Sequence, residues 1–362
     1  MLYWSLLAFF CLLYPLKKCK FCYPFLNIVS GNDFYIFLVG ITLIFFAGAR
    51  ASNVGADTEM YKEIFVWASN GKSFFQEYNS WHRGGTEPLF YLLTYVSSKF
   101  LCFNAYLTIV AIISIFPILY VISKYSRNIY FSIFIYIAFG YYPFVLSGIR
   151  QAIGIGICML AFDATIQKNI KKFIFYIIIG CLFHKTVLLF IPVYIIFSLK
   201  KQFMWIYIFI VALVLVFLLR YQIFSILNMF SRNSYDIASS EQGGYRMFYV
   251  MIFTASIGWF YYYKFIVHTN DKNSFLSWGL LLMMSISVLM WPVANLNAEL
   301  NRMYYYYHIF LMLFLPNLIH SIRLVDRMLL ILFFCIIGFY YLQFYIIEGE
   351  LKYSPYITFW ND

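Results

Sequence analysis

The residues best suited to chemistry in this sequence are five arginines that lie where apolar runs begin or end: Arg50, Arg150, Arg220, Arg246 and Arg302. An arginine costs about 3 kcal/mol at the bilayer centre and less near an interface, so these positions are informative. A guanidinium beside the N–H groups of a helix start suits a phosphate or diphosphate. The pattern indicates a site for an anionic substrate, and anchoring to lipid headgroups is the alternative for any single arginine.

Arg150 is the most informative of the five, because GIRQAIGIGI leaves almost no polar connector between two apolar runs. Its side chain is therefore expected near the plane of the membrane surface. Gln151 follows it as a second polar group that could bind the same anion. Gly154 and Gly156 allow a neighbouring helix to approach closely, which also suits simple packing.

His184 and Lys185 interrupt an apolar stretch that is long for one span and short for two. We interpret the stretch as two short helices that meet at the outer side. A histidine there can act as a general base or bind phosphate, since its ordinary pKa is about 6.5. A hydrogen bond from His184 to a neighbouring helix is the structural alternative, while Lys185 adds a cation and favours an anion site.

Asp57 is the leading candidate for a catalytic carboxylate. It follows Gly55, which permits a tight turn, and Tyr61 lies one helical turn after it. Asp57 could equally be the N-cap of a helix that begins at 58. Tyr61 and Glu87 are secondary candidates, although Glu87 before Pro88 also resembles an ordinary helix start.

Motifs for several other chemistries are absent from the sequence. It contains no HExxH, GxSxG, phosphate-binding P-loop or GxGxxG string, and its five histidines have no metal-ligand spacing. We therefore predict no metal site, no cofactor and no nucleotide chemistry, and leave open whether a metal assists the reaction.

The elements that position these residues are membrane helices. Of the 362 residues 63% are apolar and only 11% are charged, whereas a soluble domain has about 25% charged residues. The apolar runs are long and do not alternate, which excludes a β-barrel and requires helices. We expect one all-α polytopic domain over 1–362 with roughly twelve spans, near 2–16, 34–49, 104–122, 129–147, 150–167, 172–184, 185–199, 203–220, 247–266, 275–293, 304–322 and 328–347.

The net charge of +11 is interpreted as a topology signal rather than as a sign of nucleic-acid binding. Lysine-rich connectors alternate with nearly neutral ones, and basic connectors mark the cytoplasmic face. The alternation requires an outer N-terminus and an interfacial or re-entrant helix at 87–101. Long polar loops near 50–103, 220–246 and 294–303 then lie outside, so we expect the site on the outer face.

The candidate residues, taken in order along the chain, resemble the EpsG-type polysaccharide polymerases of bacteria, which are relatives of the Wzy-type O-antigen polymerases. The resemblance is carried by Arg50 with VGADTEMY, then by EPLF, IRQAIG, FHKT and, more weakly, NRMYYYY. It implies a GT-C-like architecture whose extracytoplasmic loops carry the site, in the bacterial cytoplasmic (inner) membrane and facing the periplasm. The implied substrate is an oligosaccharide linked to undecaprenyl diphosphate, and the implied partners are membrane lipid and a chain-length regulator.

The residues fit this chemistry in stated roles. A departing diphosphate gains negative charge, which fixed cations stabilise. We expect Arg50, Arg150 and His184 in that role, supported by Gln151, Lys185, Arg246 and Arg302. The attacking hydroxyl loses a proton, for which Asp57 is the first candidate base and His184 the second. A flippase or transporter of the lipid-linked unit, an O-acyltransferase and a polysaccharide ligase remain as alternatives.

Overall fold

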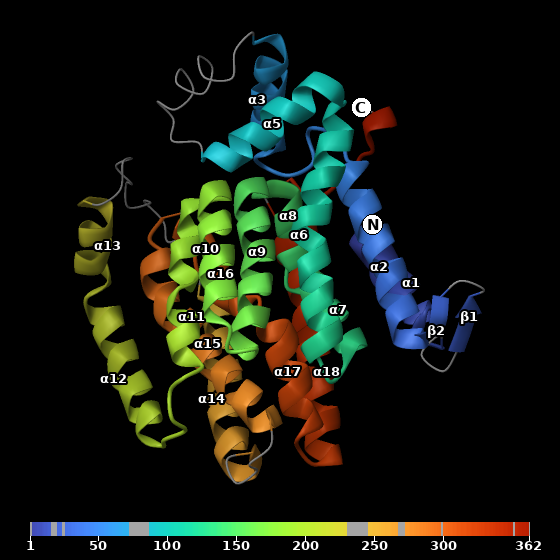
Figure 1. Cartoon of the computed structure of the whole chain (residues 1–362). Coiled ribbons are helices and arrows are strands. Elements are labelled where there is room, and N and C mark those ends of the chain that lie inside the picture. The colour runs from blue at the N-terminus through green and yellow to red at the C-terminus, as the bar shows by residue number, and fades with distance from the viewer. Residues whose placement is uncertain are drawn as a thin grey trace. The chain divides into compact units, whose positions relative to one another are not determined.

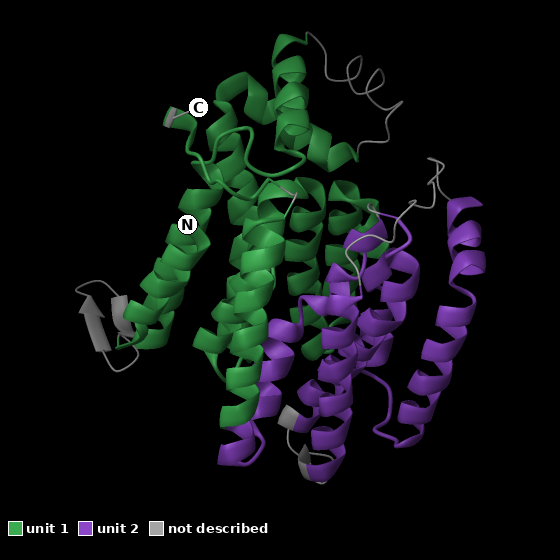
Figure 2. Cartoon of the chain, turned by 180° about the vertical axis from the view of Figure 1, so that it is seen from behind, with its two compact units in different colours: residues 1–188, 328–362 green, residues 189–327 purple. Residues whose placement is uncertain are grey.

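The structure is a computed structural model that describes residues 2–15, 20–23, 26–71, 87–229, 245–266, 272–297, 300–349 and 352–361. The chain forms two compact units, which Figure 2 shows in green and purple. Unit 1 comprises 1–188 and 328–362, and unit 2 comprises 189–327. Each unit is described by itself below.

Unit 1 is built of helices apart from one antiparallel hairpin near its beginning. The hairpin pairs β1 (Lys20–Tyr23) with β2 (Leu26–Ser30). The helices are α1 (Leu2–Leu12), α2 (Gly31–Gly48), α3 (Thr58–Asn70), α5 (Pro88–Phe100), α6 (Phe103–Tyr125), α7 (Ile129–Ala138), α8 (Tyr141–Ser147), α9 (Ile149–Ile166) and α10 (Ile170–Phe183), with the later α18 (Leu324–Tyr341), η6 (Leu342–Ile347) and η7 (Phe359–Asn361). The segment η3 (Lys185–Phe190) leads into unit 2.

The secondary-structure elements described in unit 2 are all helices. Its elements are α11 (Pro192–Ile196), α12 (Met204–Leu218), α13 (Arg220–Met229), α14 (Arg246–Tyr261), η4 (Tyr262–Ile266), α15 (Lys272–Ala294), η5 (Leu300–Arg302), α16 (Tyr305–His308) and α17 (Leu311–His320). Its helix α15 packs against α12, α14 and α17. A small apolar cluster joins Phe224 of α13 to Val293, Leu296 and Leu300.

Helices cover each of the twelve runs that the sequence predicts to span the membrane, but many of these helices are short. Among the described residues, five helices are long and apolar enough to cross a membrane, or up to seven if each of two bent pairs is one span. The bent pairs are α7 with α8, at 47°, and α12 with α13, at 73°. The structure thus confirms a helical, multi-pass membrane protein, while the count of twelve and a single domain over 1–362 stay predictions.

The helices α2, α6, α9 and α10 pack side by side and form the frame of unit 1 (Figure 1). Gly156 lies at the closest approach of α9 to α6, where an added Cβ would lie 2.8 Å from the carbonyl oxygen of Ile113. Such a contact is far too short, so glycine allows the two backbones to meet here. The prediction of a close helix approach is confirmed at Gly156.

The described residues of the loop predicted at 50–103 are largely helical. Helices α3 and α5 pack on α6 and α9 through a shared apolar core that includes Tyr61, Phe65, Phe90, Tyr106 and Ile153. At 13 residues, α5 is too short to cross the hydrocarbon, which agrees with the prediction that 87–101 makes no crossing. Figure 1 shows α3 and α5 at the end of the bundle where α9 begins and α10 ends.

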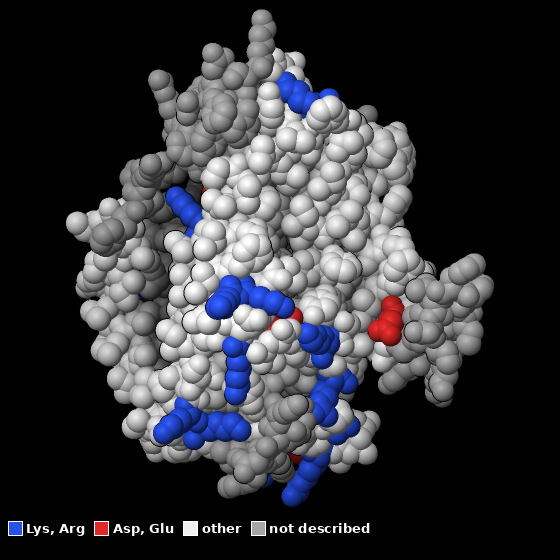
Figure 3. All heavy atoms as spheres, in the orientation of Figure 1, with Lys and Arg blue, Asp and Glu red and all other residues white. Residues whose placement is uncertain are grey.

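The surface agrees with a membrane protein. Figure 3 shows wide areas without charged side chains in this view, with most of the visible Lys and Arg side chains in its lower half. Many large apolar side chains are exposed, and the helix α12 buries none of its residues within the protein. Exposed apolar helix faces of this extent match the hydrocarbon of a bilayer.

Candidate functional site

Glu87 is the centre of a polar cluster in the folded loop region. It occupies the N-cap position of α5, and Pro88 at the start of the helix fixes the direction in which the chain enters. Its side chain makes no capping hydrogen bond and is only 7% exposed. A buried carboxylate needs partners from other elements, and Glu87 finds them on α9 and at the end of α10.

Three groups donate hydrogen bonds to the two carboxylate oxygens of Glu87. Arg150 Nη1 lies 3.1 Å from Oε2, and His184 Nδ1 lies 3.0 Å from Oε1. The backbone N–H of Lys185 also donates to Oε1, over 3.1 Å. Segments that are far apart in the sequence therefore converge on one buried carboxylate.

The start of α9 directs Arg150 toward this carboxylate. Gly148 is the N-cap of the helix, and Arg150 lies in its first turn. Its Nε donates to the Tyr61 hydroxyl over 3.5 Å, and its guanidinium lies 5.9 Å from the centre of the Phe90 ring. Arg150 is 28% exposed, so it can reach an external anion while it is held by Glu87 and Tyr61.

A break between two helices directs His184 and Lys185. The helix α10 ends at Phe183, His184 is extended, and η3 begins at Lys185. This confirms two short helical segments that meet at His184. The break is compact because an added Cβ at Gly180 would lie 2.9 Å from a methyl group of Val187. The backbone N–H of Lys185, at the first residue of η3, lacks a partner within a helix and donates to Glu87.

The charge state of Glu87 follows from its surroundings. Burial by itself raises the pKa of this carboxyl, but the hydrogen bond and charge of His184, the Arg150 cation and the Lys185 N–H outweigh burial and lower it to about 2. Glu87 is therefore ionised at neutral pH and can only accept hydrogen bonds. His184 Nδ1 then carries a proton, and in the neutral form of the ring Nε2 is the atom that can accept one.

The cluster can do two things chemically. A carboxylate that holds the Nδ1–H of an imidazole fixes the tautomer whose Nε2 is basic, and this arrangement serves general-base catalysis. A guanidinium that is anchored on one side and accessible on the other serves to bind an anion. The two functions lie side by side because both are held by Glu87.

Asp57, Gln151 and Lys185 are further predicted site residues in unit 1. Asp57 occupies the N-cap position of α3 without a side-chain capping bond, and it is an electrostatic neighbour of the Tyr61 hydroxyl. Gln151 is buried beside Arg150 in the sequence, and the Lys185 side chain is exposed. In the part of the chain that the structure describes, no three His, Cys, Asp or Glu side chains are grouped to hold a metal ion.

Arg50 lies just beyond α2 and is 2% exposed. Its ionisable neighbours are tyrosines: Tyr3, Tyr106, Tyr142 and Tyr356. Burial lowers the pKa of Arg50 to about 10, so the group stays charged at neutral pH. No hydrogen bond or ion pair joins it to Glu87 in the described part of the chain, and Tyr106 is an electrostatic neighbour of both Arg50 and Arg150.

The other predicted arginines belong to unit 2. Arg246 is exposed at the first residue of α14, as predicted. Arg302 is the last residue of η5, and α16 begins three positions later at Tyr305. Arg220 begins α13 at the bend after α12, and its Nη1 donates to the Tyr245 hydroxyl over 3.2 Å. The roles of Arg246 and Arg302 in diphosphate binding stay predictions.

Comparison with known proteins identifies the family of the chain. The sequence model of the EpsG family matches residues 33–358. The chain belongs to the EpsG family. This confirms the resemblance, and the matched range includes Arg50, Asp57, Glu87, Arg150 and His184. No curated protein and no solved structure matches the chain.

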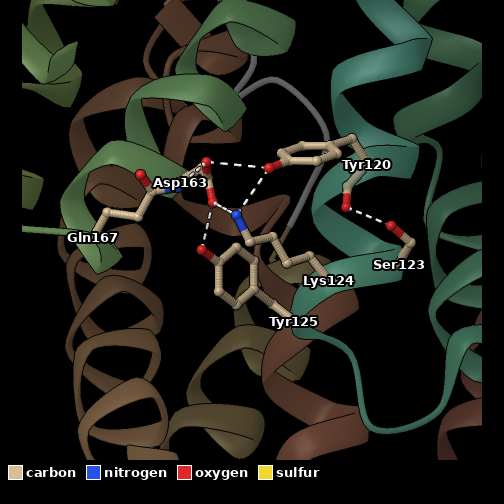
Figure 4. Close-up of polar contacts among 6 residues, drawn as sticks. All are labelled: Tyr120, Ser123, Lys124, Tyr125, Asp163 and Gln167. Atoms are coloured by element: carbon tan, nitrogen blue, oxygen red, sulfur yellow. Dashed lines mark hydrogen bonds and ion pairs between the residues drawn. The ribbon is translucent and has the colours of Figure 1, made fainter.

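A second polar network of this EpsG-family chain was not predicted from the sequence. Asp163, near the end of α9, accepts hydrogen bonds from Lys124 at 2.7 Å, Tyr125 at 2.5 Å and Gln167 at 2.7 Å (Figure 4). Tyr120 adds a longer bond of 3.3 Å. The network joins the ends of α6 and α9, and a carboxylate inside an apolar run facing a lysine connector was the signal for it.

Proposed function

We propose that this chain is a membrane glycosyltransferase that polymerises oligosaccharide repeat units carried on undecaprenyl diphosphate. The product is O-antigen or a related surface polysaccharide, made at the periplasmic face of the bacterial inner membrane. The observation that carries the proposal is the ionised Glu87, which holds a basic imidazole and an accessible guanidinium together in a chain of the EpsG family. The reaction needs one group of each kind.

His184 acts on the acceptor sugar. Its Nε2 takes the proton of the attacking hydroxyl as the oxygen forms a bond to the anomeric carbon of the donor. Glu87 keeps the proton of Nδ1 in place and stabilises the imidazolium that forms. Asp57, which we predicted as the first candidate base, becomes the second candidate, because Glu87 bonds His184 directly and Asp57 is an electrostatic neighbour of Tyr61.

Arg150 acts on the leaving group. The bond between the anomeric carbon and the diphosphate oxygen breaks, the electron pair stays on that oxygen, and the guanidinium stabilises the new charge. Undecaprenyl diphosphate leaves, and the growing chain is now on the acceptor unit. Gln151, Lys185, Arg246 and Arg302 are proposed as further contacts to the diphosphate, and a GT-C-like arrangement of twelve spans is proposed for the whole chain.

A deletion strain distinguishes this function from a flippase or a ligase. Its surface polysaccharide is separated on a gel, with native protein supplied from a plasmid as the control. A polymerase predicts a lipid core that carries a single repeat unit, because transfer of one unit does not need polymerisation. A bare core would contradict the proposal and indicate a flippase or a ligase.

The sidedness of the proposal has its own test. A reporter that is active only in the periplasm is fused within 220–246, a loop proposed to be outside. Activity of the reporter is expected. Activity of a matching cytoplasmic reporter at the same position would contradict a periplasmic site.

A further inference from the structure

Arg50 carries a charge that nothing in its described surroundings neutralises. Its Nη1 donates to the carbonyl oxygen of Ala47. Among the described residues, its Nε and Nη2 have no hydrogen-bond partner although both atoms are fully buried. A buried guanidinium with unsatisfied N–H groups is costly, which asks for a compensating role.

The groups that surround Arg50 do not supply the missing acceptors. Its strongest electrostatic neighbours are four tyrosines, and none of the ion pairs among the described residues includes Arg50. Three of the tyrosine hydroxyls donate to carbonyl oxygens, Tyr3 to Tyr353 at 3.4 Å, Tyr142 to Leu43 at 3.0 Å and Tyr356 to Phe46 at 2.5 Å, and the Tyr106 hydroxyl bonds the Thr94 hydroxyl at 3.0 Å. None of the four accepts a hydrogen bond from Arg50 Nε or Nη2. Arg50 therefore lies in a polar but uncharged enclosure.

The two unsatisfied atoms of Arg50 identify the ligand that would fit. Nε and Nη2 form one edge of the guanidinium, and their N–H bonds run parallel. Such an edge binds two oxygens of a phosphate or a carboxylate at once. With the tyrosines around it, this edge has the donor geometry that a phosphate-type anion requires.

A segment from the far end of the sequence closes this site. Lys352–Asn361, which we call the strap, runs antiparallel to the chain after α2 and pairs Thr358 with Arg50. Ala51 N–H donates to the Ile357 oxygen at 2.9 Å, Phe359 N–H to Ala49 at 3.0 Å and Gly55 N–H to Lys352 at 2.9 Å. The strap also supplies Tyr356 as one wall of the enclosure.

The strap is attached to the rest of unit 1 by backbone hydrogen bonds, side-chain contacts and one exposed ion pair. Among them are the three backbone hydrogen bonds, the Tyr356 bond to Phe46, the Tyr3 bond to the Tyr353 oxygen and a Lys352–Glu59 ion pair at 3.8 Å, which contributes little. It could therefore separate from α2 without unfolding a helix. In Figure 1 the red segment that ends at the C label lies beside the end of α2.

We propose that Arg50 is a second anion-binding subsite, for a phosphate group of the substrate, and that the strap must open to admit it. The identification of the anion as part of a lipid-linked diphosphate rests on the proposed function. The burial of Arg50 and its cover do not depend on that function. Because Tyr106 neighbours both Arg50 and Arg150, an opened Arg50 adds a second cation to the region of the Glu87 cluster.

Arginine-specific labelling tests the strap without any enzyme assay. The purified full-length protein in nanodiscs is treated with phenylglyoxal, and the modification of each arginine is followed by peptide mass spectrometry. Exposed Arg323 is the internal standard. We expect Arg50 to react at least tenfold more slowly than Arg323 in the native chain, and to approach the rate of Arg323 in a chain that stops after 351.

Two further arms complete the test. If the shortened chain fails to fold, Tyr356→Ala removes one wall and one strap bond, while Tyr356→Phe is the matched control that keeps the ring. Tyr356→Ala is expected to raise the labelling rate of Arg50 severalfold more than Tyr356→Phe. Inorganic pyrophosphate is then expected to slow the labelling of the opened Arg50, as bound anion protects it.

Each result bears on a separate part of the proposal. Equal labelling of Arg50 and Arg323 in the native chain would show that nothing covers Arg50. Slow labelling that survives both loss of the strap and Tyr356→Ala would show that the strap is not the cover. Labelling that pyrophosphate does not slow would overturn the anion subsite. Because no polymer is measured, these outcomes are independent of whether the chain polymerises sugars.

Discussion

Glu87 accepts a hydrogen bond from Nδ1 of His184 over 3.0 Å, although 97 residues separate them in the sequence. The same carboxylate binds Arg150, so a proton acceptor and an anion-binding cation share one support. The consequence is that the geometry of both groups depends on a residue that need not touch the substrate. The predictions below separate the role of each group.

The choice of base is tested by a pair of substitutions. His184→Ala removes the proposed acceptor Nε2 and is expected to lower the rate of polymer formation by about 10²- to 10⁴-fold. Asp57→Asn, which keeps the shape of the side chain, is expected to cost less. The measurement is the polymer ladder together with the abundance of each variant in the membrane, and His320→Ala, at an exposed histidine, is the control. A full ladder from His184→Ala would exclude His184 as the base.

Arg150→Lys tests whether the guanidinium is needed as a fork and not only as a charge. A lysine keeps the cation but cannot bond Glu87, Tyr61 and a phosphate together. We expect the rate of polymer formation to fall by about 10- to 100-fold. We also expect pyrophosphate to protect the remaining arginines of the site less well against phenylglyoxal. Arg323→Lys, at an exposed position, should change neither quantity. Equal activity of Arg150→Lys and native protein would reduce Arg150 to a simple counter-charge.

The pKa of Glu87 predicts a pH dependence of stability. Because folding lowers this pKa from 4.5 to about 2, the unfolded chain binds more protons between these pH values. The contribution of Glu87 is therefore complete above about pH 4.5, amounts to about 3 kcal/mol, and is lost as the pH falls toward about 2.

The check is a series of thermal unfolding curves in detergent for native protein and Glu87→Gln. The native protein should melt at a higher temperature near neutral pH, and the difference should shrink as the pH is lowered below about 4.5. A constant difference across the whole range would mean that the ionised form of Glu87 is not what stabilises the cluster.

Asp163→Asn tests the network at the other end of α9. It removes the charge that holds Lys124 and weakens the bonds from Tyr125 and Gln167. Because Lys124 is 37% exposed, we expect a loss of only about 1–2 kcal/mol in unfolding free energy, measured by the melting temperature. The polymer ladder should be normal once the amount of protein is matched. A lost ladder at equal abundance would give Asp163 a role in function.

Much of the architecture could be predicted from the sequence because bilayer physics acts on composition. Long apolar runs must be helices, and the positions of Arg150 at a helix start and of His184 at a helix break followed from run lengths. The lengths of the individual helices were less predictable, since α8 and α13 bend away at breaks that hydropathy does not mark.

The candidate site was predicted in its members but not in its centre. Glu87 ranked below Asp57, because Glu87–Pro88 has the pattern of a helix start and nothing local shows that its side chain turns away from the cap. Only tertiary packing joins it to Arg150 and His184. The strap over Arg50 was missed for the same reason, since a pairing between 50 and 358 leaves no periodic signal in the sequence.

The most direct test of the central claim is reconstitution of the purified chain with a lipid-linked repeat unit as the sole substrate. Native protein is compared with Glu87→Gln and with Glu63→Gln, an exposed carboxylate of α3. We predict that native protein and Glu63→Gln release undecaprenyl diphosphate and form lipid-linked products of two and more units, at a rate about 10²-fold above that of Glu87→Gln. Products of equal length and rate from all three proteins, or no product from the native protein, would contradict the account.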